Sequence, residues 1–172
     1  MTETPGVFDI HGREKRQKRI YEMLSESDIL DENKRLIRDY VKYRTVESGL
    51  SPLRQEKIIS NLMVFAGFLG KSFKEADKAD IQRIIEAVYT MPSNKRKGEN
   101  LADSTKSAYC KILKSFFCWL KSSENPEETA WLKPPNYEPK KLSKSDKLFW
   151  EDIEKLSRAA MNKRDFLLPQ LL

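Results

Sequence analysis

The chain has 172 residues and a mass of 20.1 kDa, a length typical of one domain or of one domain with attachments. Its 39% apolar and 34% charged residues are typical of a soluble protein. The net charge of +6 is compatible with a polyanionic partner but does not require one. It has no apolar run of about 20 residues for a membrane span and no apolar N-terminal signal segment. Its two cysteines are too few for a disulfide framework, so we expect a reducing cytoplasmic compartment.

Helical spacing of apolar residues, with little glycine and almost no strand-like alternation, predicts an all-α fold. Residues 1–26 are expected to form a basic N-terminal tail with a short helix near 13–25. The expected helices after it are 31–48, 52–69, 80–91 and 103–122. We therefore predict a four- to five-helix bundle over residues 27–125.

The clearest local signals flank the helix 52–69. Ser51 offers a capping hydroxyl, Pro52 suits the first helical position, and Gly70 is a plausible stop. Weaker candidates at other helix ends are Asp28 or Asp31, Gly49, Asp80, and Asp103 or Ser104.

A proline-rich and lysine-rich stretch, 126–147, follows the predicted bundle and suggests an extended basic linker. Helical periodicity resumes in 148–172, and the chain ends inside an apolar run. We interpret 148–172 as the truncated start of a further domain.

The helix 103–122 has the most informative side-chain pattern. Projected at about 100° per residue, one sector of about 140° holds lysines, a serine and both cysteines. These residues are Lys106, Ser107, Cys110, Lys111, Lys114, Cys118 and Lys121. The opposite side is aromatic and is expected to be buried. Since no acidic residue occurs from Ser104 to Ser123, this face is predicted to meet phosphates in the major groove.

Simpler explanations remain open at each position. The lysines could form an ordinary solvated face. Arg54 and Lys57, in the first turns of 52–69, could hold a phosphate or could be a routine polar start. Cys110 and Cys118 would lie about 12 Å apart along one helix, too far for a disulfide, and His11 adds no metal site.

Two segments resemble the core-binding domain of tyrosine recombinases, the phage integrase family, and archaeal-type integrases in particular. Residues 51–69, SPLRQEKIISNLMVFAGFL, resemble the second helix of that domain, although Arg54 and Ile58 stand where Thr and Tyr are usual. Residues 104–120, STKSAYCKILKSFFCWL, resemble its fourth helix with Leu-Lys-x-Phe-Phe-x-Trp-Leu.

The resemblance implies a SAM-like helical domain whose second and fourth helices face duplex DNA. The DNA-binding residues expected on this basis are Arg54, Lys57, Lys106, Ser107, Lys111, Lys114 and Lys121. It also implies that the catalytic residues belong to a following domain, so no catalytic residue, metal or cofactor is assigned here and the chain itself is not expected to be an enzyme. The expected partners are double-stranded DNA and, for a full-length recombinase on DNA, other protomers, in a nucleoid-associated setting.

Two other classes of function remain as alternatives. A helical protein-interaction module would use the apolar C-terminal residues and leave the lysines incidental. An intact small enzyme would need a convergent nucleophile, base or metal set, and the sequence offers none.

Overall fold

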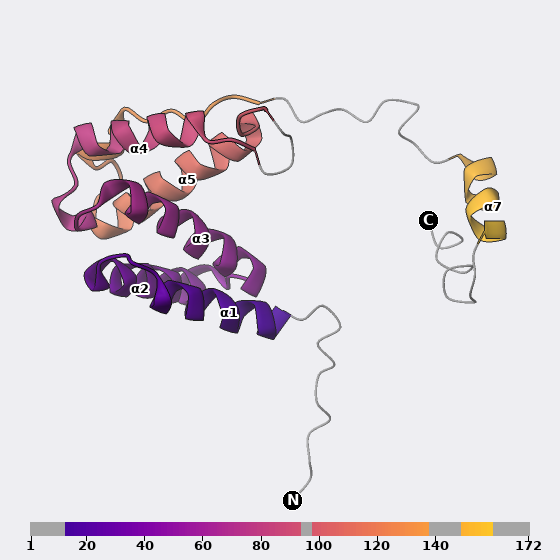
Figure 1. Cartoon of the computed structure of the whole chain (residues 1–172), viewed down its shortest axis with the longest axis horizontal. Coiled ribbons are helices and arrows are strands. Elements are labelled where there is room, and N and C mark those ends of the chain that lie inside the picture. Colours follow the sequence, from indigo (N-terminus) through magenta and orange to yellow (C-terminus); the bar gives the residue numbers. More distant parts are fainter. Residues whose placement is uncertain (1–12, 94–97, 138–148, 160–172) are drawn as a thin grey trace, which may run out of the picture. The chain divides into compact units, whose positions relative to one another are not determined.

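A computed structural model describes residues 13–93, 98–137 and 149–159 (Figure 1). Within these ranges the chain is helical apart from loops and one isolated bridge between Pro92 and Asn100, which confirms the all-α prediction. No helix in these ranges is both long enough and apolar enough to cross a bilayer. The predictions for the tail 1–12, the basic loop 94–97, the linker 138–148 and the C-terminal 160–172 lie outside the described residues.

The described residues belong to two units, the first with residues 13–93 and 98–137 and the second with residues 149–159. The first unit contains α1 (Arg13–Glu26), α2 (Asp31–Ser48), α3 (Pro52–Leu69), the 3-10 turn η1 (Phe73–Glu75), α4 (Lys78–Thr90), α5 (Asp103–Leu120) and α6 (Glu127–Ala130). The second unit contributes α7 (Trp150–Ala159), an amphipathic helix.

The α5 helix is the centre of the first unit because it packs against α2, α3, α4 and α6. Its aromatic side meets rings from the earlier helices. The Phe116 ring lies 4.9 Å from Phe73 and 5.3 Å from Tyr40, both edge to face, an arrangement that aromatic pairs prefer. The Tyr40 hydroxyl donates to the Ser115 hydroxyl at 2.8 Å, so the buried ring keeps a partner for its polar end.

The first unit is larger than the predicted bundle over 27–125. Ile20 and Leu24 of α1 are buried in the core, as are Thr129 and Leu132 after α5. The stretch 126–137, expected as linker, therefore begins with residues that pack on the bundle. The α1 helix, expected as part of the tail, is one of the helices of the bundle. The single-turn helix α6, within 126–137, is too short to leave a periodic signal in the sequence.

Helix boundaries agree with prediction where local chemistry sets them. Ser51 caps α3 by accepting the Arg54 amide, Pro52 begins the helix, and Gly70 ends it in the left-handed region. The predicted start of α5 at Asp103 is confirmed, with Ala102 as an N-cap that has no side-chain hydrogen bond. The capping role considered for Asp28 or Asp31 at α2 is wrong, since Leu30 is the N-cap and offers no capping atom. The α4 helix begins two residues earlier than predicted because Asp77, not Asp80, is its N-cap.

One buried amide ties the middle of the chain to α2. Asn33, 1% exposed, donates from Nδ2 to the Lys71 carbonyl at 2.8 Å and accepts the Phe73 amide on Oδ1 at 2.9 Å. Both groups of the side chain are thus satisfied, as a buried amide requires. This clamp places Phe73 under the aromatic side of α5.

Asp80 carries the main electrostatic contact at the start of α4. Its carboxylate is buried, lies 2.6 Å from Lys71 Nζ, contacts the Arg83 guanidinium, and accepts the Asp77 amide at 3.0 Å. The Lys71 hydrogen bond, followed by the Asp77 amide, lowers the pKa of Asp80 to about 2.

We expect Asp80→Asn to lower the free energy of unfolding by about 1–3 kcal/mol near pH 6, because Lys71, Arg83 and the Asp77 amide lose a charged acceptor. The folded pKa of about 2 lies below the ordinary 3.8, so this stability is present above pH 4 and is lost as the pH falls toward 2. Urea unfolding at pH 6 and pH 2.5 measures both values. The exposed Asp39→Asn is the control. A wild-type to Asp80→Asn difference that stays constant between pH 6 and pH 2.5 contradicts the assignment.

Candidate nucleic-acid interface

The side of α5 that faces solvent is not the lysine sector predicted from the sequence. Exposed and half-buried residues on this side line up in one strip, here called the α5 strip: Ser104, Ala108, Lys111, Ser115 and Cys118, followed by Ser122 in the turn after the helix. The centre of this strip is rotated by about 90° around the helix from the centre of the predicted sector. The two overlap only at Lys111 and Cys118.

Three further residues of the predicted sector lie against α4 or α6: Lys106, Cys110 and Lys121. Lys106 lies over the Tyr89 ring, 5.4 Å from its centroid, and pairs with Asp103 at 3.6 Å. Cys110 is fully buried, with its sulfur 3.5 Å from the Tyr89 hydroxyl, and burial raises the pKa of the Cys110 thiol. The prediction that Cys110 lies on an open face is therefore wrong.

Lys121, at the other end of this sector, is neutralised by a residue of α6. Its Nζ lies 2.7 Å from the Glu128 carboxylate and donates to the Lys74 carbonyl at 3.3 Å. Burial, the largest single effect, raises the pKa of Glu128, but the Lys121 hydrogen bond, a backbone hydrogen bond and the Lys121 charge together lower it below its ordinary value. Lys121 is thus part of the packing between α5 and α6.

The remaining predicted residues of α5 differ in access. Lys111 is exposed and Lys114 is half-buried, and neither pairs with a carboxylate in the part of the chain that the structure describes. Ser107 is 2% exposed, so its hydroxyl lies at the base of the surface and not on it.

Arg54 and Lys57 of α3 meet Lys111 of α5 around a hollow of about 430 Å³, here called the basic hollow. Its lining is completed by Ser104, Thr105, Ser107, Ala108 and Tyr137. The lining includes cations and hydroxyl groups but no carboxylate. Four residues predicted as DNA-binding, Arg54, Lys57, Ser107 and Lys111, therefore share one site.

The backbone at this hollow adds to its positive potential. Both α3 and α5 begin beside it, and the first amides of a helix carry a partial positive charge. The first turn of α3 contains no acidic residue that would offset this charge. The site is thus suited to an anion.

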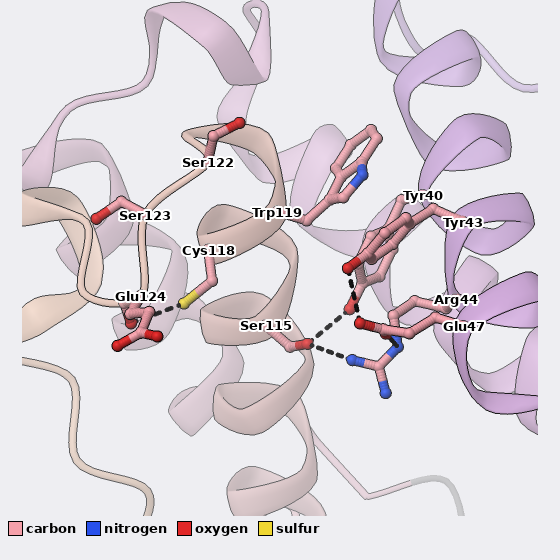
Figure 2. Close-up of a pocket in the computed structure, with 10 residues that line it drawn as sticks. All are labelled: Tyr40, Tyr43, Arg44, Glu47, Ser115, Cys118, Trp119, Ser122, Ser123 and Glu124. Carbon is pink, nitrogen blue, oxygen red and sulfur yellow. Dashed lines mark hydrogen bonds and ion pairs between the residues drawn. The ribbon is translucent and has the colours of Figure 1, made fainter.

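A second hollow, of about 350 Å³, lies farther along the α5 strip and is lined by aromatic rings (Figure 2). Here Arg44 is held on both sides: Nη1 donates to the Ser115 hydroxyl at 3.1 Å, and Nε lies 3.4 Å from Glu47. Glu47 also accepts the Tyr43 hydroxyl at 2.7 Å, a bond that raises the pKa of Tyr43. Since the guanidinium already faces a carboxylate, this hollow attracts anions less than the basic hollow does.

Sequence reasoning missed Ser104, Thr105, Ser115 and Tyr137. Ser104 and Ser115 lie at the boundary between the predicted lysine and aromatic sectors, and Thr105 projects among the aromatic and apolar residues. A helical projection alone does not tell which side neighbours cover. Tyr137 lies in a stretch assigned to the linker. No local signal marks these residues.

Among the described residues, no three His, Cys, Asp or Glu side chains gather closely enough to hold a metal ion. Comparisons of this chain with family models, with curated proteins and with solved structures yield no match.

The two cysteines test the rotation of α5. We expect Cys118, on the α5 strip, to react readily with a soluble thiol reagent in the folded protein. Cys110 should react only through opening of the bundle, slower by a factor on the order of 100 for an opening free energy of about 3 kcal/mol. Cys110→Ser and Cys118→Ser isolate the two rates. Equal rates in the two variants would place both thiols on one open face and contradict the described packing.

Proposed function

We propose that this chain binds duplex DNA, with the basic hollow and the α5 strip against the sugar–phosphate backbone. The observation that carries the proposal is the convergence of Arg54, Lys57 and Lys111, from two helices, on one hollow whose lining contains no carboxylate.

Uncompensated cations that face each other repel, and this repulsion is unfavourable in the free protein. Phosphates remove the repulsion, and each phosphate neutralised by a cation also releases condensed counterions. A surface whose role is only to be solvated gains nothing from such an arrangement, since mixed signs provide stabilising pairs. The convergence of like charge therefore favours a polyanion as partner.

The shape of the α5 strip suits an elongated partner. Between Ser104 and Cys118 the helical part of the strip extends about 21 Å at 1.5 Å per residue. Apart from Lys111, its side chains are small, which permits close approach of a backbone. Its length corresponds to about six base pairs at 3.4 Å per step.

The family resemblance supports the same reading. The helices expected to face DNA in a tyrosine recombinase core-binding domain correspond to α3 and α5, and these two helices line the basic hollow. We accordingly propose that the chain is such a domain, that its parent protein is a site-specific recombinase, and that cleavage chemistry belongs to another domain.

A protein-interaction module is the second candidate, favoured by one observation on α7. Trp150 is 66% exposed and Phe149 54% exposed, an apolar surface of the kind that binds other proteins. Gel filtration separates the two candidates. Duplex DNA shifts the elution of a DNA-binding domain, whereas an interaction module elutes in the same position with and without DNA.

The DNA proposal predicts different effects for two lysines of the same helix. Lys111→Gln should reduce the slope of log affinity against log salt concentration by about 0.9, the value for one phosphate contact. Lys121→Gln should leave the slope unchanged, because Glu128 already neutralises that lysine. Fluorescence anisotropy with a labelled duplex at several salt concentrations measures both slopes.

The two variants remove the same charge from the same helix, so each controls for the other. Arg54→Gln combined with Lys57→Gln should reduce the slope by about 1.8. Equal slopes for Lys111→Gln and Lys121→Gln, or no duplex binding by the wild-type chain, would overturn the proposal.

A further inference from the structure

The first turns of α1 lie level with the first turns of α3. Gln17 Nε2 donates to Gln55 Oε1 at 2.8 Å, and the Tyr21 hydroxyl lies 3.5 Å from the same oxygen. Gln55 is buried, and its Nε2 donates to the Leu50 carbonyl at 3.1 Å. Gln55 thus joins α1 to the start of α3, next to Arg54.

The outward side of α1 is strongly basic. Its exposed cations are Lys15, Arg16, Lys18 and Arg19. Only Lys18 has a carboxylate partner in the described residues, Glu22 at 3.9 Å, and both side chains of that pair are well exposed to solvent. Exposed pairs of this length contribute little. The exposed Glu22 and Glu26 lie toward the C-terminal end of α1, so the exposed charge over residues 15–19 is positive.

At one end of the first unit, α1 and α3 therefore begin with exposed cations, and α5 adds Lys111 from its third turn. The α1 helix packs on α3, α3 packs on α5, and all three start at that end (Figure 1). With neighbouring axes about 8–10 Å apart, this surface extends roughly 16–20 Å across the helices.

We infer that the basic side of α1 is a further part of the DNA interface and contacts phosphates beyond those reached from the basic hollow. The inference rests on the proposed function, and it adds residues that the family resemblance did not include. Each strand of duplex DNA carries one charge per 3.4 Å, so a surface of this width meets several phosphates.

The packing of α1 favours DNA over an anionic membrane as the partner of this charge. A helix that binds a membrane surface inserts an apolar face between the lipid headgroups. In α1 the apolar residues Ile20 and Leu24 are buried against the other helices, and Met23, 48% exposed, is a single side chain and not an apolar face. What remains outside is mainly charge, which suits a polyanion with an exposed backbone.

The test compares two variants of the full chain with equal loss of charge. Lys15→Gln/Arg16→Gln/Arg19→Gln removes cations from α1, and glutamine keeps a helix propensity close to that of lysine and arginine. Arg35→Gln/Lys42→Gln/Lys78→Gln removes the same charge from exposed positions of α2 and α4. Circular dichroism and thermal unfolding verify that both variants fold.

We expect the α1 variant to reduce the salt slope of duplex binding by about 2–3, with a smaller change for the α2/α4 variant. Equal slopes for the two variants, while the wild-type chain still binds duplex DNA, would overturn the role of α1 and leave the basic hollow in place. Failure of the wild-type chain to bind duplex DNA would overturn the proposed function itself. Binding of anionic vesicles with no binding of duplex would assign the α1 charge to a membrane.

Discussion

Burial of α5 on several sides is the constraint from which the other features of the first unit follow. A helix that packs against α2, α3, α4 and α6 has only a narrow sector left for solvent. Small residues occupy that sector, so the groove along α5 remains open, while the aromatic rings of Phe116 and Phe117 fill the opposite side. The Asn33 clamp on the Lys71–Phe73 segment supports the same centre, because it positions the Phe73 ring against Phe116.

The fold could be predicted from sequence wherever the deciding chemistry is local. Ser51, Pro52 and Gly70 bound α3 as expected, since capping and left-handed glycine depend only on adjacent residues. The caps of α2 and α5 could not be predicted, because those helices begin without a side-chain hydrogen bond and are held by packing. The single-turn helix α6 depends on contacts with α4 and α5 alone.

The candidate site could be predicted only in part, for a related reason. A helical projection ranks residues around an axis but does not say which neighbours cover each side. Lys106 and Lys121 look equivalent to Lys111 in sequence, yet α4 and α6 bring Tyr89 and Glu128 to them and leave Lys111 free. The difference between these lysines comes from contacts with other helices. Such contacts decide whether a lysine is held within the protein or is available to a ligand.

The distribution of acidic residues at the starts of the helices also distinguishes the basic hollow from other parts of the surface. Acidic residues in a first turn stabilise a helix by about 0.3–1 kcal/mol, and α2 and α4 have them. The first turn of α3 has none, and Arg54 stands there instead. In α5, the Asp103 carboxylate pairs with Lys106, on the side turned away from the basic hollow. Of the two helices that begin beside the basic hollow, α5 keeps an acidic first-turn residue and α3 has none, so the missing stabilisation of α3 coincides with the surface that an anion would stabilise.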